Sequence, residues 1–181
     1  MGTRGLPLLA VTFVLTFSSV AYAQTSVTLT DTSQTTTLTA SVSEQARVTV
    51  PAGITFNVSN VAASTAAGAA TVSVSSIVLA TATKHFKVSL QANAAAFSPP
   101  VGGAVTWSAS DVSWNAAAWT NATSALGTLS NAAYNTVATC AADAADCSTS
   151  ALVFTLGAKG TVKRAGSHTL VVTWKFESIG S

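Results

Sequence analysis

Apolar and polar residues alternate over several short stretches of the chain, with the period of two that is typical of β-strands. The most regular stretch lies near the end, at His168–Ile179, where every second residue of Leu170–Phe176 is large and apolar. β-Branched and aromatic residues dominate it, as suits a pleated, half-buried surface. We interpret it as a long strand around which the rest of a sandwich packs.

Shorter stretches show the same alternation and are separated by turn-forming residues. The clearest are Ile54–Val58, Phe86–Leu90 and Leu152–Leu156. A further stretch changes phase at Ser75–Ser76, which predicts a bulge or a crossing between sheets. Roughly nine or ten strands at this spacing, without a long 3.6-residue apolar stripe, are typical of sandwiches. The pattern predicts an all-β antiparallel sandwich of the immunoglobulin-like or jelly-roll kind.

The first 23 residues have the pattern of a signal peptide. Arg4 is followed by the largely apolar Leu6–Val20 and by Ala21-Tyr22-Ala23, a small-x-small cleavage site. Cleavage would leave one domain, residues 24–181, with no later stretch apolar enough for a membrane helix. The expected location is therefore extracellular, at the cell surface, or periplasmic in a Gram-negative cell.

Charge is scarce as well as balanced. Charged residues make up 8% of the chain, and loss of Arg4 would leave seven basic residues against six acidic ones, a net charge near +1. This profile argues against a nucleic-acid partner. Weak repulsion between copies favours close packing with neighbours, so copies of the chain or other envelope proteins are the expected partners.

Cys140 and Cys147 are the two cysteines of the chain. In an exported protein we expect them to form one disulfide. It would close a loop of about eight residues and stabilise the fold by roughly 2.5 kcal/mol. The alternative is a metal pair, although a zinc site takes four ligands.

The residues with catalytic potential are few and scattered. Of the carboxylates, only Asp143 and Asp146 lie close together, inside the cysteine loop, where they either contribute to a calcium site or keep the loop soluble. His85 and His168 are the only histidines, and common nucleophile, phosphate-binding and zinc motifs are absent. We predict no enzyme, no catalytic residues, no cofactor and no metal, with a small secreted hydrolase as the remaining enzymatic alternative.

Three tryptophans, Trp107, Trp114 and Trp119, lie close together in a loop-rich region. Exposed tryptophans stack on sugar faces, so these residues are the candidate ligand contacts of a carbohydrate-binding module that would recognise a surface glycan. The alternative is that all three cap one end of the core. A turn between Trp107 and Trp114 would be needed to place both rings on one face, because their positions differ in parity.

The signal peptide, the Thr- and Ser-rich β chain, the short cysteine loop and the alternating last strand together resemble bacterial secreted surface sandwiches. These include pilin-like subunits and proteins of the spore coat protein U type. Val172-Thr173-Trp174-Lys175-Phe176 is also similar to the closing Trp-x-Leu strand of cell-wall-binding domains, with Phe176 in place of the leucine. The resemblance implies a structural or adhesive surface protein.

Thr25–Val42 alternates apolar and polar residues but has few large side chains to anchor it. Two outcomes are open. The segment either pairs within its own sheet or adds as a strand to the edge of a neighbouring copy, where main-chain hydrogen bonds supply affinity. Head-to-tail addition would give an open filament.

Overall fold

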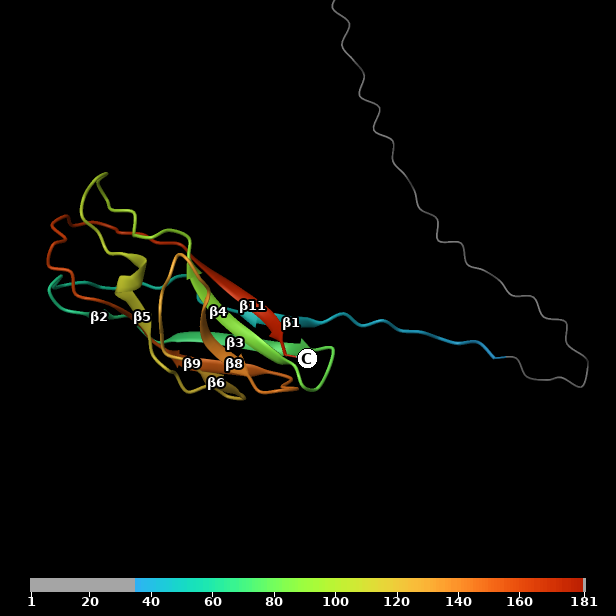
Figure 1. Cartoon of the computed structure of the whole chain (residues 1–181). Helices are drawn as coiled ribbons and strands as arrows, with labels where there is room; N and C mark the ends of the chain where they lie inside the picture. The colour runs from blue at the N-terminus through green and yellow to red at the C-terminus, as the bar shows by residue number, and fades with distance from the viewer. Residues whose placement is uncertain (1–34, 181) are drawn as a thin grey trace, which may run out of the picture. The chain divides into compact units, whose positions relative to one another are not determined.

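The computed structural model describes residues 35–180, and these residues form an all-β fold of eleven strands and one 3₁₀ helix (Figure 1). The expected signal peptide, residues 1–23, lies outside the described residues, as does most of Thr25–Val42. The chain divides into two units, Met1–Ala40 and Ser41–Ser181. The described part of the first unit, residues 35–40, contains no strand, and all eleven strands belong to the second unit.

The strands form three antiparallel sheets. The first has the order β1 (Gln45–Thr49), β3 (Ala70–Val78), β9 (Cys147–Leu152). The second has the order β2 (Thr65–Ala66), β10 (Phe154–Leu156), β5 (Val112–Trp114), β7 (Gly127–Thr128). The third has the order β11 (Val172–Ile179), β4 (His85–Ala92), β8 (Asn135–Cys140), β6 (Ala122–Ser124).

One side of the sandwich is closed by two links between the first and third sheets, one a disulfide and the other a hydrogen-bonded backbone bridge. The disulfide between Cys140 and Cys147 joins β8 of the third sheet to β9 of the first. Close by, Thr120 bridges Ser148 on β9, and the chain then continues into β6, which pairs with β8. These two links hold the first and third sheets together along the β8–β9 side.

The core consists of apolar side chains that the alternation turns inward from facing sheets. Val88 and Leu90 of β4 have no exposed surface, and Val72, Val74 and Leu152 come from the opposite layer with at most 1% exposed. Roughly 25 cal/mol is gained per Å² of apolar surface removed from water, so these side chains dominate the stability. The core is continuous from β3 and β9 through β4 to the two tryptophans beside β5.

Two local predictions are confirmed. The phase change in β3 is a bulge, because the register with β1 shifts between Gln45 and Arg47, and Ser76 has a left-handed φ of 52°. A turn does separate Trp107 from Trp114: the 3₁₀ helix η1 (Ala109–Asp111) lies between them, and both rings are buried. In a continuous strand Trp107 and Trp114 would point to opposite faces. The intervening turn changes the direction of the second side chain, so both rings reach the core.

Two other predictions are wrong. The last stretch does form a strand, but β11 lies at the edge of its sheet and pairs with β4 alone, so it is not the centre of the sandwich. Ile54–Val58 is assigned to no strand, although Ile54, Phe56 and Val58 are each half-buried. Its alternation correctly indicates a one-faced extended segment, but that segment has no hydrogen-bonded neighbour strand in the described residues.

Candidate functional site

The side of the sandwich opposite the disulfide is open. Within the described part of the chain, β1 pairs only with β3 and β11 pairs only with β4, so each has one unpaired edge. Near the carboxyl end of β11 the two edges approach each other, and Ser178 Oγ donates to Glu44 Oε1 at 3.2 Å. Glu44 also accepts from Lys84 Nζ at 2.9 Å and from the Ala80 N–H at 2.7 Å. This end of the open side is therefore tied together.

Farther from Glu44, the two edges continue as extended segments that are not strands. Residues 51–61 follow β1, and residues 162–171 precede β11. A cavity of about 1210 Å³ lies between these two segments. We call it the edge cavity. It exceeds the roughly 300–1,000 Å³ of ordinary small-ligand pockets. Its two long walls are extended segments, and in the second of them Thr169 exchanges backbone hydrogen bonds with Ser98.

The floor of the edge cavity is the apolar core itself. Leu90, Val112 and Leu156, each at most 4% exposed, reach it from three strands of two sheets. The walls add half-buried apolar side chains from both extended segments and from β11: Ile54, Phe56, Val58, Leu170, Val172 and Trp174. The edge cavity therefore has the shape of a missing strand. A strand presents alternate side chains to one face, where the cavity has its apolar floor, and hydrogen-bonding groups to both sides, where the cavity has its two extended walls.

The tryptophans predicted as ligand contacts do not form an exposed platform. Trp107 and Trp114 are 4% and 3% exposed, and their indole N–H groups donate to the carbonyls of Gly157 and Ala125. Trp119 is half-buried. Sugar stacking needs an accessible ring face, which Trp107 and Trp114 lack, so the core-capping alternative describes these two residues.

His168 fixes the loop that forms one wall of the edge cavity. Its Nε2–H donates to the Arg164 carbonyl at 3.1 Å, and its Nδ1 accepts from the Thr106 hydroxyl at 2.7 Å. The ring also packs edge-on against Trp107, with 5.2 Å between centroids. These contacts give His168 a structural role beside the buried Trp107.

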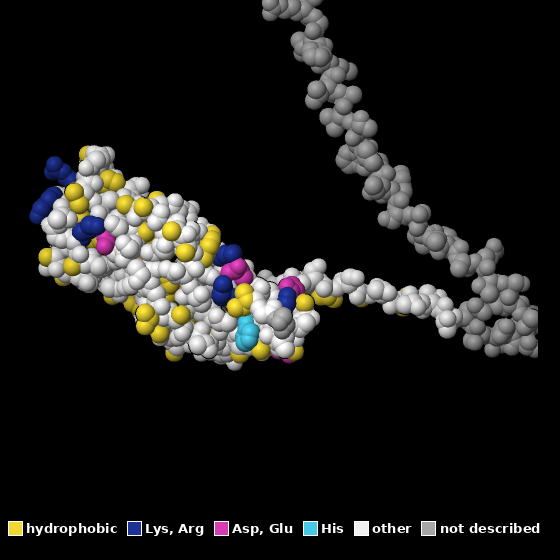
Figure 2. Space-filling model, in the orientation of Figure 1, with side chains coloured by type: hydrophobic (Ala, Val, Ile, Leu, Met, Phe, Trp, Pro, Cys, Tyr) yellow, Lys and Arg dark blue, Asp and Glu magenta, His cyan; other side chains and the backbone are white. Residues whose placement is uncertain are grey.

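Near the edge cavity, one lysine has an acidic partner, whereas two other basic side chains have none among the described residues. Asp111 pairs with Lys159 at 2.8 Å. Burial favours the neutral form of the Asp111 carboxyl, but hydrogen bonds from Lys159 and the Ser108 N–H outweigh it, so the pKa of Asp111 is lowered. Lys163 and Arg164, unlike Asp111 and Lys159, line the cavity; both are exposed, and neither forms an ion pair with the described residues. Figure 2 shows basic side chains gathered at the left end of the folded body.

The segment that enters β1 is exposed and carries apolar residues. Leu38 is 91% exposed and Val42 is 73% exposed, and neither lies in a strand. Residues 35–42 form no strand, and the rest of Thr25–Val42 lies outside the described residues, so both predicted outcomes for this segment stay open.

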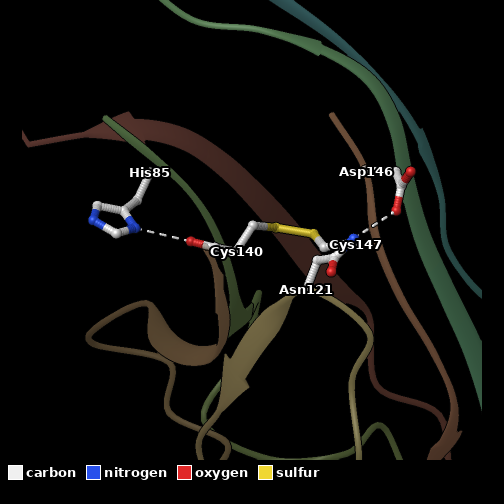
Figure 3. Close-up of a disulfide and its surroundings, with 5 residues drawn as sticks. All are labelled: His85, Asn121, Cys140, Asp146 and Cys147. Carbon is white, nitrogen blue, oxygen red and sulfur yellow. Dashed lines mark hydrogen bonds between the residues drawn. A yellow bond between two sulfur atoms is a disulfide. The ribbon is translucent and has the colours of Figure 1, made fainter. Parts of the chain in front are cut away.

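The cysteine pair lies on the closed side, and neither cysteine lines the edge cavity. Figure 3 shows the disulfide with its neighbours His85, Asn121 and Asp146. The predicted Cys140–Cys147 disulfide is confirmed, with 5.9 Å between the Cα atoms. In its loop, Asp146 accepts from Asn121 Nδ2 at 3.1 Å, and His85 Nδ1–H donates to the Cys140 carbonyl at 2.9 Å. The alternative of a metal-binding cysteine pair is therefore wrong.

Comparison with known proteins gives no relative: no protein-family model, no curated protein and no solved structure matches the chain. Across residues 35–180 no helix is long and apolar enough to span a bilayer. The edge cavity was missed from the sequence because its lining comes from segments more than 100 residues apart. The local signals were the alternation of Ile54–Val58 and that of Leu170–Phe176, which both contribute side chains to the walls.

Proposed function

We propose that the protein is a secreted, non-catalytic structural subunit of a cell surface, which assembles by strand addition between copies. The N-terminal arm, defined as residues 24–43, of one copy occupies the edge cavity of the next. The observation that carries this proposal is the open side of the sandwich, where residues 51–61 and 162–171, which continue the edge strands β1 and β11, flank a cavity of about 1210 Å³ with an apolar floor. Main-chain hydrogen bonds to both edges supply affinity, and alternate apolar side chains fill the cavity.

The composition of the arm supports this assignment. Val27 and Leu29 alternate with threonines, and Asp31 is the only charged side chain from residue 24 to residue 43. Extended at about 3.3 Å per residue, twenty residues reach roughly 65 Å, which is enough to span one cavity and leave a linker. The arm is therefore both long enough and apolar enough to bridge two copies.

The signal-peptide pattern of residues 1–23, the disulfide and the low charge support the expected location outside the cytoplasm. Disulfides persist in oxidising compartments, and a surface with few charges tolerates dense packing of copies. Donation from each copy to the next is heterologous and does not close on itself, so it produces filaments. A filament of such subunits is a structural or adhesive element of the surface.

The direct test compares the mature chain, residues 24–181, with a variant that lacks Gln24–Thr39. Light scattering after size exclusion and negative-stain electron microscopy report the assembly state. We expect oligomers or fibres from the mature chain and a folded monomer from the deletion. A mature chain that stays monomeric at high concentration, or a deletion that assembles equally well, would contradict the proposal.

A matched pair of variants separates cavity filling from nonspecific adhesion. Val27→Asn with Leu29→Asn removes the apolar face of the arm, whereas Thr28→Asn with Thr30→Asn changes the opposite face. Assembly should be lost in the first and retained in the second, because only one face of a strand points into the cavity. As a second readout, a peptide of residues 24–43 should raise the Tm of the deletion variant, since a ligand that binds only the folded state stabilises it.

A further inference from the structure

Two cations at the edge cavity have no acidic partner. Four of the basic side chains in the described residues pair with carboxylates: Lys84, Lys87, Lys159 and Lys175. Lys163 and Arg164 do not, and both line the cavity. Their positions, eight or more residues before the start of β11, place them away from Glu44, which contacts Ser178 near the opposite end of that strand.

The loop that carries these cations is held in place. Its backbone is tied through the Arg164 carbonyl, which accepts from His168, and His168 is in turn held by Thr106. Gly166 adopts a φ of 126°, and a Cβ there would lie 2.8 Å from Pro100 Cβ, so the chain turns tightly against its neighbour. The two cations are thus presented from an anchored loop.

The arm offers one charge to meet them. Val27, Leu29 and Asp31 occupy alternate positions, so in an extended arm all three side chains lie on the same face. If Val27 and Leu29 enter the apolar cavity, Asp31 follows about 7 Å behind Leu29 on the inward face. An ionised carboxylate buried in an apolar cavity without a partner is costly, so Asp31 needs a cation where the arm enters.

We propose that Lys163 and Arg164 of one copy bind Asp31 of the next copy and thereby set the register and depth of the inserted arm. This inference rests on the proposed function. It also places the arm's entry at the Lys163–Arg164 end of the cavity, with Val27 and Leu29 deeper toward β1. A shift by one residue turns Val27 and Leu29 away from the cavity, and a shift by two residues separates Asp31 from its cations.

The length of the remaining linker fits this entry point. Residues 32–43 separate Asp31 from Glu44, which is anchored beside the carboxyl end of β11 in its own copy. Twelve extended residues cover about 40 Å. Successive copies would therefore meet with the Glu44 end of one facing the Lys163–Arg164 end of the next, which is a head-to-tail arrangement.

A charge-swap experiment tests the inference in the mature chain. The variants are Asp31→Lys, Lys163→Glu with Arg164→Glu, and the combination of all three changes. Arg47→Glu is the matched control, because Arg47 is an exposed cation on β1 outside the cavity lining. Assembly rates are followed by light scattering at low and high salt, and circular dichroism checks that each variant is folded.

We expect each of the first two variants to assemble roughly tenfold or more slowly at low salt, because charges at the rim of an interface act mainly on association. The combination should recover most of the wild-type rate. About 1 M salt should shrink the difference between wild type and the Asp31→Lys variant, since screening removes both attraction and repulsion.

Two outcomes would overturn the inference while leaving strand addition intact. One is an Asp31→Lys variant that assembles at the wild-type rate although the arm deletion does not assemble. The other is rescue of Asp31→Lys by Arg47→Glu and not by the Lys163–Arg164 change. If the arm deletion itself assembles normally, the proposed function fails instead, so the two failures are distinguishable.

Discussion

Removal of the disulfide should destabilise the domain without affecting the edge cavity. Cys140 and Cys147 link β8 to β9 on the closed side, whereas the unpaired edges belong to β1 and β11. The sequence separation is seven, so the bond closes a loop of about eight residues and contributes roughly 2.5 kcal/mol by constraining the unfolded chain. Replacing both cysteines by alanine also removes two buried sulfur atoms, for which we add on the order of 1 kcal/mol.

The expected loss in free energy of unfolding for Cys140→Ala with Cys147→Ala is therefore about 3–4 kcal/mol. For a domain of this size it corresponds to a fall in Tm of roughly 7–14 °C. Typical domains have about 5–15 kcal/mol of stability, so we expect the variant to remain folded at room temperature. The measurement is urea unfolding followed by tryptophan fluorescence, because Trp107 and Trp114 are buried. The matched control is Asp143→Asn in the same loop, where asparagine tolerates the φ of 53°.

Two results would refute this reasoning. A loss below about 1 kcal/mol would show that the bond does not constrain the unfolded chain as the loop length predicts. A folded double variant that no longer assembles would show that the closed and open sides are coupled. We expect instead that assembly of the double variant at room temperature matches that of the wild type.

Two further predictions concern stability. Gly127→Ala should cost about 1–3 kcal/mol in urea unfolding, because a Cβ there would lie 2.7 Å from Trp114 Cε2, whereas Gly68→Ala, with nothing within 4 Å, should be nearly neutral. Asp111→Asn should remove one source of acid sensitivity. The lowered pKa of Asp111 gives stability that is present above its ordinary value of 3.8 and is lost as pH falls below it. The stability difference between wild type and Asp111→Asn should therefore shrink below about pH 4 in acid titrations of unfolding; a difference that stays constant down to about pH 2 would contradict it.

Local pattern was sufficient for much of the fold. The alternation in Phe86–Leu90 corresponds to β4, whose Val88 and Leu90 are fully buried. The phase change at Ser75–Ser76 corresponds to a bulge, and the cysteines form the predicted bond. These features depend on neighbouring residues or on a short loop, so the physical causes lie within a few positions of the chain.

The position of β11 and the role of residues 51–61 could not be read in the same way. Both stretches alternate as strongly as a central strand would. Alternation shows only that one face of a segment is covered, and it does not show how many neighbours the segment has. Whether a strand has one neighbour, two or none depends on segments far away in sequence. Trp174, for example, packs against the core and is half-buried, and it also lines the edge cavity.

Strand period and cysteine spacing are local properties, so the all-β class, several of the strands and the disulfide could be predicted from the sequence. The closure of one side of the sandwich by Cys140–Cys147, and the open side between β1 and β11, depend instead on how the whole chain folds. The fold also places residues 51–61 and 162–171 on two sides of one cavity, where Lys163 and Arg164 have no acidic partner within residues 35–180. Backbone pairing and the meeting of distant segments are set by the whole chain at once, and no local pattern encodes which edge is left without a strand.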